Sequence, residues 1–251
     1  MRKQRIIHSF GRAERYQQEA RLQQRVADTL ARLLPPLTRP TLLELGCGTG
    51  FLSRHLLQRW PAAPFLCSDI ALPMVQRCRA HLGDRPHLYH AVLDGERPAV
   101  LPDRFDLVAA SMVWQWFDKP LDLLQQWHDR LRPGGCLAMA TLGPATFQTW
   151  RAACDHLGMA NGLPAYPTVT AWQRAWPAPG LATLREEEII LHHASALAFL
   201  RGLRAIGAQQ PAPGYRPQPA GLLRRLLRHL EEEKGFSVNY QVVYGVFRKD
   251  P

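Results

Sequence analysis

The feature that most constrains this chain is a short apolar run that contains an acid and leads into three alternating glycines. The run is Thr41–Leu45, its acid is Glu44, and the glycines are Gly46, Gly48 and Gly50. Glycine permits positive φ and leaves space for a ligand to approach the backbone, and a helix that begins here offers free N–H groups. The segment therefore predicts a buried strand that turns into a helix beside a nucleotide-like ligand.

The glycine spacing separates this turn from two common phosphate-binding loops. Dinucleotide-binding turns use G-x-G-x-x-G, and P-loops end in Gly-Lys followed by Ser or Thr. This chain has G-x-G-x-G, and no Lys-Ser/Thr pair follows it. The pattern resembles motif I of class I S-adenosylmethionine methyltransferases. That resemblance implies S-adenosyl-L-methionine as the methyl donor and S-adenosyl-L-homocysteine as the product.

Strands and helices are expected to alternate along the first 143 residues, after a first helix over 13–34. The apolar runs predict strands at 42–45, 65–67, 87–93, 105–110 and 136–141. The intervening patterns predict helices at 52–59, 73–81 and 120–131. Such an alternation is typical of a doubly wound, mostly parallel, Rossmann-like α/β sheet.

The pattern changes after Gly143. The remaining sequence predicts helices at 147–157, 169–176, 196–206 and 221–230, and strands at 184–191 and 240–247. We therefore expect a seven-stranded sheet with a helical lid insertion. The expected units are a helical cap (1–36), a cofactor-binding core (37–143), a substrate lid with one core strand (144–236) and a final core strand (237–251).

Two further acids follow the next two predicted strands. Asp69 ends the second strand, where an acid can accept both hydrogen bonds of a ribose diol. Asp94 follows the third strand, and in the methyltransferase family an acid at this place receives the adenine amino group. Each acid taken singly could instead be a solvated loop residue. Met74 matches the family position that packs on the adenine face, and its alternative role is plain helix core.

Three more residues beside these motifs complete the expected cofactor site: Ile70, Gly95 and Ser111. Ser111 ends the fourth strand, where the fold normally faces the transferred methyl group. Trp114 and Trp116 follow, and they either form the wall of an apolar substrate pocket or fill the core. This region has neither an Asn-Pro-Pro-Tyr nor a Pro-Cys motif, so nothing in it indicates methylation of a nucleic acid base.

The charge distribution narrows the classes of partner. The net charge is +10, and the segment from Ile189 to Leu230 holds six arginines and no acid. A basic surface attracts nucleic acid, anionic membranes or acidic proteins. The arginines are not interleaved with aromatic residues, so we expect no nucleic acid partner. No apolar run approaches the ~18 residues of a membrane span, so we expect no membrane partner either.

The cysteines indicate the compartment. There are five, scattered and without a C-x-x-C pair. This usage is typical of free thiols in a reducing cytoplasm, and the spacing predicts neither a disulfide framework nor a metal site.

Segments along nearly the whole chain resemble the malonyl-acyl carrier protein O-methyltransferases of biotin synthesis. They are Ser9–Ala13 with Tyr16, Ala20 and Leu22–Gln23, then Val113–Trp116, Thr141–Gly143, Leu200–Ala208 and Tyr240–Val246. The stretch from Arg201 to Ala208 is the most specific of them, because general methyltransferases lack it.

The resemblance implies methyl transfer to the free carboxylate of a malonyl group. That group would be carried on the phosphopantetheine of acyl carrier protein, and the methyl ester would prime pimeloyl synthesis for biotin. A carboxylate is already ionised at neutral pH, so we expect no general base, and alignment is the enzyme's main contribution. The alternative is methylation of a free small carboxylic acid, of the trans-aconitate type, which shares the Trp-Gln-Trp region.

The resemblance also implies three candidate catalytic residues. Tyr16 is similar to an N-terminal tyrosine that closes over the cofactor, and its alternative is a helix-face aromatic. Arg201 or Arg204 could hold the malonyl carboxylate in bidentate fashion, and both could instead be surface cations. The helix over 221–230 is basic on one side, so it is either a docking face for the acidic carrier protein or an ordinary amphipathic helix.

Overall fold

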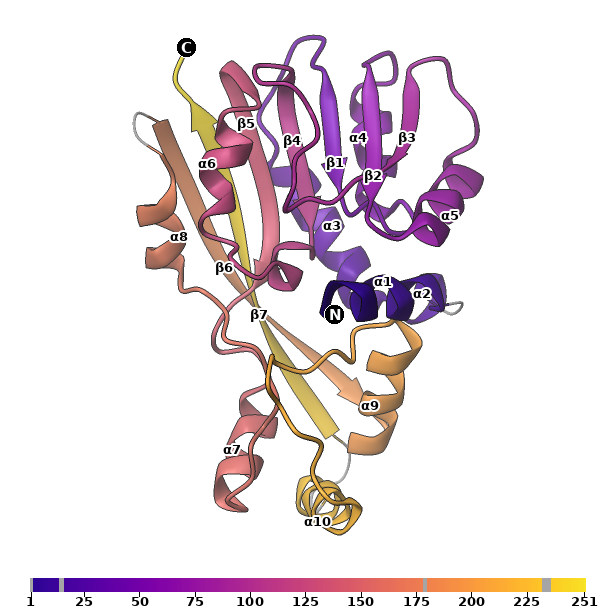
Figure 1. Cartoon of the computed structure of the whole chain (residues 1–251), viewed down its shortest axis with the longest axis vertical. Helices are drawn as coiled ribbons and strands as arrows, with labels where there is room; N and C mark the ends of the chain where they lie inside the picture. Colours follow the sequence, from indigo (N-terminus) through magenta and orange to yellow (C-terminus); the bar gives the residue numbers. More distant parts are fainter. Residues whose placement is uncertain (1, 14–15, 178–179, 232–235) are drawn as a thin grey trace.

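The computed structural model describes residues 2–13, 16–177, 180–231 and 236–251 (Figure 1). Its seven strands form one sheet in the order β3-β2-β1-β4-β5-β7-β6. The neighbours among β1 to β5 are parallel, and β7 runs antiparallel between β5 and β6. The predicted Rossmann-like, mostly parallel sheet of seven strands is confirmed.

The strands have the following bounds: β1 (Leu42–Leu45), β2 (Phe65–Asp69), β3 (Leu88–Val92), β4 (Phe105–Ser111), β5 (Leu131–Leu142), β6 (Gly180–His193) and β7 (Phe236–Lys249). Several predicted boundaries are wrong: β6 and β7 extend beyond the predicted 184–191 and 240–247 at both ends, and two further differences concern β5 and α6. The strand β5 begins five residues before the predicted 136, because a register shift lets Leu131 pair with Phe105. For the same reason the helix α6 (Leu123–His128) is shorter than the predicted 120–131.

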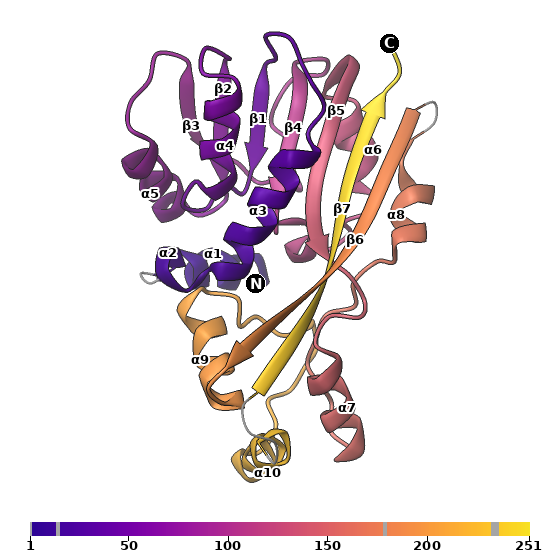
Figure 2. The same ribbon diagram turned by 180° about the vertical axis from the view of Figure 1, so that it is seen from behind.

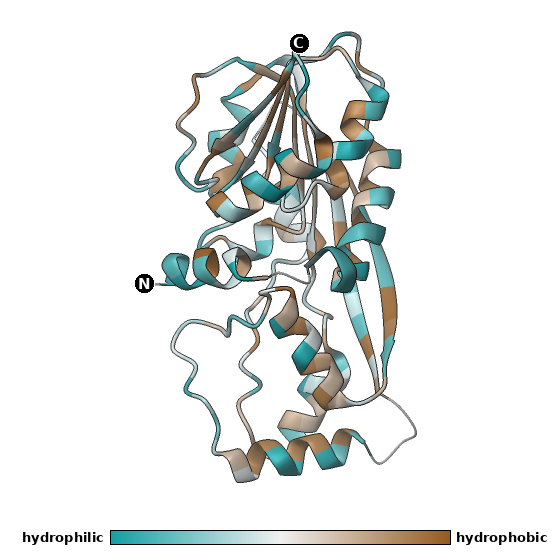
Figure 3. Cartoon of the chain, turned by 90° about the vertical axis from the view of Figure 1, so that its right-hand side faces the viewer, coloured by the Kyte–Doolittle hydropathy of each residue, from teal (hydrophilic) through white to brown (hydrophobic). Residues whose placement is uncertain are grey.

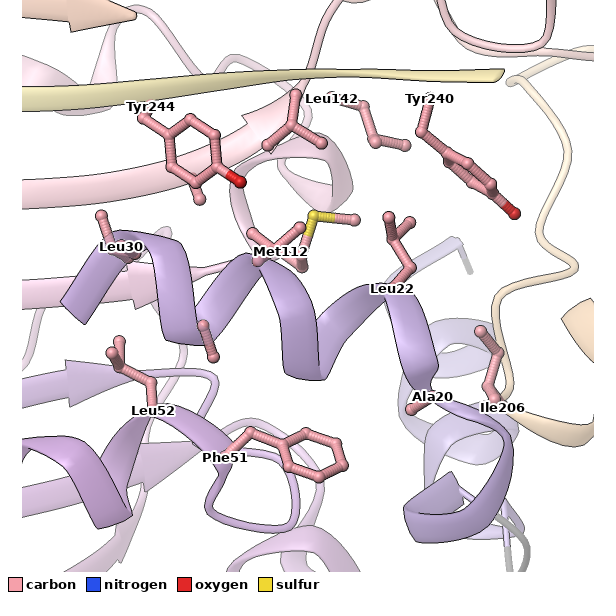
Figure 4. Close-up of a cluster of buried hydrophobic side chains, with 14 of the residues drawn as sticks. Ala20, Leu22, Leu30, Phe51, Leu52, Met112, Leu142, Ile206, Tyr240 and Tyr244 are labelled. Atoms are coloured by element: carbon pink, nitrogen blue, oxygen red, sulfur yellow. The ribbon is translucent and has the colours of Figure 1, made fainter. Parts of the chain in front are cut away.

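Helices cover both faces of the sheet. On one face lie α3 (Arg21–Leu33), α4 (Phe51–Arg59) and α5 (Leu72–Leu82), and on the other lie α6 and α8 (Val169–Ala175) (Figures 1 and 2). Each face buries its own apolar cluster. Figure 4 shows how α3 fits in: Leu30 lies between Tyr244 of β7 and Leu52 of α4, and Leu22 lies on the side of Tyr240 of β7.

The N-terminal segment differs from the expected single helix over 13–34. The structure has α1 (Arg2–Gly11), which the sequence did not predict, then α2 (Tyr16–Glu19) and α3, with residues 14 and 15 outside the described part. Ala20 interrupts the helix because its φ of −84° and ψ of 48° are not helical. The chain therefore turns there, and α1 and α2 lie across the carboxyl ends of β1 and β2 (Figure 1).

The lid is built on the distal halves of β6 and β7, which continue beyond the parallel strands (Figures 1 and 3). It adds α7 (Gln148–His156), α9 (Ala196–Ala205) and α10 (Ala220–Leu230). Phe147 packs between α9 and β7 in the lid: its ring centroid lies 5.5 Å from that of Phe199 and 5.0 Å from that of Tyr240. Within the described ranges, no helix combines the length and the apolar character that crossing a bilayer requires.

Candidate active site

Two cavities lie side by side at the carboxyl ends of the parallel strands. The strand-end cavity contains about 830 Å³ of space, open mouth included, beneath α1 and α2. The lid cavity contains about 1540 Å³, counted in the same way, between α3, α9, β6 and β7. Small-molecule sites usually span roughly 300–1,000 Å³. Met112 and Trp116 line both cavities, so the two spaces adjoin at these side chains.

The strand-end cavity brings together eight of the ten expected cofactor residues: Gly46, Gly48, Asp69, Ile70, Met74, Asp94, Gly95 and Ser111. Seven of them lie at or just after the ends of β1, β2, β3 and β4, which the parallel sheet places along one edge, and Met74 lies on α5.

The glycine turn leaves its backbone open to this cavity. Gly46 and Gly48 have φ values of 65° and 54°, which side chains rarely adopt. A Cβ on Gly46 would lie 2.3 Å from Cγ2 of Val113, so no other residue fits there. A Cβ on Gly48 would point toward the ring of Tyr16, at 3.8 Å, and would take up space between the turn and that ring.

Asp69 is the carboxylate that faces this turn. Its Oδ2 accepts a hydrogen bond from the Gly48 amide at 3.1 Å, and its Oδ1 accepts one from the Ala71 amide at 2.8 Å. Burial raises the pKa of Asp69 to about 6, although the two amides act in the opposite direction. Each carboxylate oxygen keeps a further lone pair, so the group can still accept hydrogen bonds from a diol.

Ion pairs hold α1 over the cavity. Lys3 Nζ lies 2.7 Å from Asp94 Oδ2 and 2.7 Å from Glu96 Oε2, and Arg2 pairs with Asp118. Burial lowers the pKa of Lys3, but its hydrogen bonds to Asp94 and Glu96 outweigh burial and raise that pKa overall. The N-terminal helix is thus attached to the acids that follow β3.

Ser111 supplies an independent sign that a ligand belongs here. Its Oγ is buried and has no hydrogen-bond partner among the described residues. Leaving such a group unpaired costs about 1–3 kcal/mol, so a bound group that pairs with it is favoured. Met74 is 1% exposed and adds an apolar wall. Two acids, an open backbone, an apolar wall and a free hydroxyl together fit an adenosyl group with a polar tail.

Glu44 and Gly50 lie behind the glycine turn rather than in the cavity, contrary to expectation. Glu44 Oε2 accepts a hydrogen bond from Ser53 Oγ of α4 at 2.5 Å. Burial raises the pKa of Glu44 well above its ordinary value, and the nearby Cys78 adds to the effect. Alternate strand residues point to opposite faces, and Leu45 rather than Glu44 lines the cavity. Gly50, with φ 94°, caps α4.

An aromatic group closes the cavity from the N-terminal side. Tyr16 begins α2 and stacks on Phe51, with ring centroids 6.2 Å apart. The rings of Phe10 and Trp116 pack in a T-shaped arrangement, with centroids 5.3 Å apart. Burial, with a contribution from Asp69, raises the pKa of Tyr16 above its ordinary value. The phenol therefore stays neutral at physiological pH, so it can donate a hydrogen bond but cannot accept a proton.

Trp114 and Trp116 have separate positions although they share one short 3₁₀ turn. Trp116 lines both cavities, as expected of a pocket wall. Trp114 is fully buried, and its ring lies 5.3 Å from Phe117 and 5.6 Å from Trp172. It lines neither of the two cavities, because η1 turns its indole toward the face that α6 and α8 cover.

Arg201 and Arg204 do not face the lid cavity, which corrects the expectation that one of them grips the substrate there. Both side chains are exposed on α9. The opposite side of this helix, with Phe199, Leu203 and the following Ile206, lines the cavity instead. Two arginines three residues apart share one face of a helix, and here that face is the outer one.

The polar groups that do line the lid cavity were not expected from the sequence. Arg21, Gln23 and His193 are among its lining residues. The Oε1 atom of Gln23 and the Nε2 atom of His193 are buried and find no partner in the described chain. Burial lowers the pKa of His193, and Arg21 and His192 lower it further. Arg21 and Gln23 occupy polar positions of an amphipathic helix, so the helical pattern assigns them to solvent.

Several known proteins similar to this chain are named methyltransferases. A methyltransferase-domain family model matches residues 16–186. A malonyl-[acyl-carrier protein] O-methyltransferase of Magnetococcus marinus is 45% identical over 250 residues, which cover 98% of this chain and 92% of that protein. One of the same name from Dechloromonas aromatica is 31% identical over 98% of this chain and 95% of its own length.

A biotin biosynthesis bifunctional protein of Bordetella avium is also similar. It is 40% identical over 94% of this chain, and the match covers 50% of that protein. Among solved structures, the YcgJ protein of Bacillus subtilis has a TM-score of 0.66 at 12% identity, over 90% of this chain and 99% of that one. A methyltransferase of Mesorhizobium loti has a TM-score of 0.52 at 17% identity, over 88% and 96% of the two chains.

Proposed function

Because this chain belongs to the malonyl-[acyl-carrier protein] O-methyltransferase family, we propose that its strand-end cavity holds the methyl donor and its lid cavity the malonyl group. One observation carries the proposal: the two cavities adjoin at Met112 and Trp116. A methyl group bound on one side and a carboxylate bound on the other would meet at this boundary.

The enzyme transfers a methyl group from S-adenosyl-L-methionine to the free carboxylate of malonyl-acyl carrier protein in biotin synthesis. S-adenosyl-L-methionine supplies a methyl on a sulfonium; a carboxylate oxygen forms the new bond to carbon, and the electrons of the broken C–S bond stay on sulfur. The carboxylate is ionised at neutral pH, so no proton has to move. The protein is left with the tasks of binding, alignment and exclusion of water.

For the donor, we assign the ribose to Asp69 and the adenine amino group to Asp94. Met74 would cover the adenine ring, and Ser111 would pair with the polar tail of the molecule. These assignments are supported by the common position of the four residues around the strand-end cavity. Tyr16 would close the cavity as a neutral phenol beside the Gly48 backbone, consistent with its raised pKa.

For the acceptor, we assign the malonyl carboxylate to Arg21 and Gln23 at the start of α3. Their positions at the lid cavity support this choice. An exposed guanidinium can hold one carboxylate oxygen and leave the other free to react. His193, with its lowered pKa, would be neutral and would hydrogen-bond the malonyl thioester rather than carry charge.

For the carrier protein, we propose a basic lid surface made of five exposed arginines: Arg201, Arg204, Arg224, Arg225 and Arg228. They come from α9 and α10, which pack against each other in the lid. Acyl carrier proteins are acidic, and complementary charge chiefly increases the rate of encounter. Docking there would leave the phosphopantetheine arm to enter the lid cavity.

We also propose that the enzyme works in the cytoplasm. All five of its cysteines lie in described segments and are free. Thiols persist in this state in a reducing compartment.

The test is a transfer assay with methyl-labelled S-adenosyl-L-methionine and four parallel acceptors: malonyl-acyl carrier protein, malonyl-coenzyme A, trans-aconitate and RNA. We expect label on malonyl-acyl carrier protein, removable by mild alkali as an ester requires. Equal transfer to trans-aconitate would replace the carrier-bound acceptor with a free acid. Label on RNA alone would refute the carboxylate chemistry.

A further inference from the structure

Two cysteines and a histidine converge behind the glycine turn, outside the machinery assigned above. Cys67 lies on β2, His90 lies on β3, and these two residues are register partners. Cys78 lies on α5, which packs over the same two strands. The two sulfur atoms and one imidazole nitrogen lie within 4.8 Å of one another.

This cluster has the composition and size of a zinc-type site. Zn²⁺ binds thiolate sulfur at about 2.3 Å and imidazole nitrogen at about 2.0–2.1 Å, in a tetrahedral arrangement. In a tetrahedral site such ligand atoms lie roughly 3.6–3.8 Å apart, so the three groups, now within 4.8 Å of one another, need to approach by up to about 1 Å to share one ion. Two adjacent strands and a packed helix are rigid elements on which to hold it.

His90 supplies a second observation. Its Nε2 atom is buried and has no hydrogen-bond partner among the described residues. A buried imidazole nitrogen without a partner is costly, and a metal bond would satisfy it. Neither Cys67 nor Cys78 is exposed to solvent, so the thiols face the imidazole within the fold rather than the surface.

The surroundings favour thiolate formation at one member of the cluster. Ser53 Oγ lies 3.7 Å from the sulfur of Cys78, close enough for a hydrogen bond in which either atom could be the donor. Metal ligands of this kind bind as thiolates, and a hydroxyl beside the sulfur can stabilise that form by donating a hydrogen bond to it.

We propose that Cys67, Cys78 and His90 bind a thiophilic divalent cation of the zinc class, with Cys47 as the fourth ligand. Cys47 stands between Gly46 and Gly48, and its buried thiol interacts electrostatically with that of Cys78. The ion would link β2, β3 and α5 through their side chains, and through Cys47 it would hold the glycine turn in place from the side opposite the strand-end cavity. Its role is structural, because no member of the cluster lines the strand-end cavity.

The four residues come from four separate elements, which explains why no ligand spacing is visible in the sequence. Structural zinc sites are usually recognised from C-x-x-C pairs. Here Cys47, Cys67, Cys78 and His90 lie 20, 11 and 12 positions apart along the chain, and only the fold brings them together.

The experiment measures metal binding by the full chain in the absence of donor and substrate. Reduced, chelator-treated protein is titrated with Zn²⁺ and, separately, with Co²⁺, whose absorption spectrum reports thiolate ligands. We expect one ion per chain, a thiolate-to-cobalt band, and a higher melting temperature with Zn²⁺ than without it. The variants His90→Gln and Cys78→Ser should each weaken binding at least tenfold.

Cys136→Ser and Cys154→Ser are the matched controls, since both cysteines are buried and lie outside the cluster. Each should bind one ion as tightly as the unaltered protein does. His90 is only partly buried, so His90→Gln keeps the test decisive if Cys78→Ser fails to fold. A metal content near zero after Zn²⁺ loading, or binding that survives His90→Gln unchanged, would overturn the proposal.

Discussion

At the residue scale, Asp69 is the group whose chemistry the structure constrains most. Its pKa of about 6 lies above the ordinary value because of burial, so the carboxylate is ionised at pH 7 and becomes protonated near pH 5. A protonated carboxyl loses an acceptor that a ribose diol requires. The affinity for S-adenosyl-L-methionine should therefore fall below pH 6, approaching tenfold per pH unit.

Calorimetric titrations between pH 5 and pH 8 would test this prediction. Asp69→Asn should bind about ten- to a hundredfold more weakly at pH 8, the loss expected for charge-assisted hydrogen bonds, and should show a flat pH profile. Because the folded-state pKa is raised, protonation of Asp69 stabilises the fold, so weaker binding at pH 5 would not reflect unfolding through this group. A pH profile that is the same in both proteins would refute the assignment.

Glu44 gives a second prediction at this scale, about stability rather than binding. Burial raises the folded-state pKa of Glu44 well above its ordinary value of 4.5. The fold therefore loses stability as pH rises from that ordinary pKa toward the raised one, because the buried carboxyl has to ionise. Glu44→Gln keeps the shape and the Ser53 contact without the charge. The variant should be more stable than the unaltered protein at pH 8, by up to about 1.4 kcal/mol per pH unit traversed.

Denaturant unfolding at pH 5, 6.5 and 8 measures this difference, which should shrink toward pH 5. Glu188→Gln is the control, because Glu188 is exposed on β6 and its neutralisation should leave the pH dependence unchanged. A Glu44→Gln variant that is less stable at every pH would show that the carboxylate is ionised and required.

The residue scale also shows what the sequence can and cannot specify. Asp69, Asp94 and Ser111 could be placed because each ends or follows a parallel strand, and such ends meet at one edge of the sheet. Glu44 could not be placed from the sequence, since a strand side chain points to one face of the sheet or the other, and only the fold shows which face borders the cavity. Trp114 and Trp116 are two residues apart in a 3₁₀ turn, and only tertiary packing decides which of them reaches a cavity.

At the element scale, helix orientation was the least predictable property. The existence of α9 was predicted, but not its rotation, since the sequence does not show whether the side that carries Arg201 and Arg204, the polar residues of this helix, faces the cavity or solvent. Arg201 and Arg204 consequently belong to the outer surface. Similarly, α1 is basic and short, and it is positioned by ion pairs to Asp94 and Glu96 rather than by a wide apolar face.

The position of α1 leads to a prediction about retention of the methyl donor. Lys3→Gln removes both ion pairs to the acids after β3, each worth about 0.2–1 kcal/mol when partly exposed. The cover over the strand-end cavity should then open more often. We expect S-adenosyl-L-methionine to dissociate two- to tenfold faster, in stopped-flow displacement by S-adenosyl-L-homocysteine.

The salt dependence gives the accompanying readout. Added salt should speed dissociation from the unaltered protein, because it screens these pairs, and should have less effect on Lys3→Gln. Lys119→Gln removes an exposed lysine and should behave like the unaltered protein. Equal dissociation rates for Lys3→Gln and Lys119→Gln would contradict a retaining role for α1.

At the scale of the whole molecule, two functions of positive charge are separated in space. Arg21 lies at the lid cavity, where it can reach a malonyl carboxylate. The basic lid surface lies on the outside of α9 and α10, away from the parallel strands (Figure 1). A net charge of +10 alone could not distinguish these roles from nucleic acid binding, whereas the arrangement of the lid connects them to one carrier-bound substrate.

This separation predicts which kinetic constant each charge controls. Reversing two charges of the basic lid surface, in Arg224→Glu with Arg225→Glu, should raise KM for malonyl-acyl carrier protein about tenfold or more at low salt. It should leave kcat within about twofold, because the reacting groups are untouched. KM for malonyl-coenzyme A should not change, since that substrate has no acidic protein to dock.

Arg104→Glu is the matched control: Arg104 is exposed just before β4, at the opposite end of the sheet from the lid. The control should retain the KM of the unaltered enzyme for both substrates, and the difference between the variants should narrow as ionic strength rises. An equal increase in KM for both substrates would place Arg224 and Arg225 at the malonyl or pantetheine site instead. An unchanged KM for the carrier-bound substrate would move the docking surface elsewhere on the molecule.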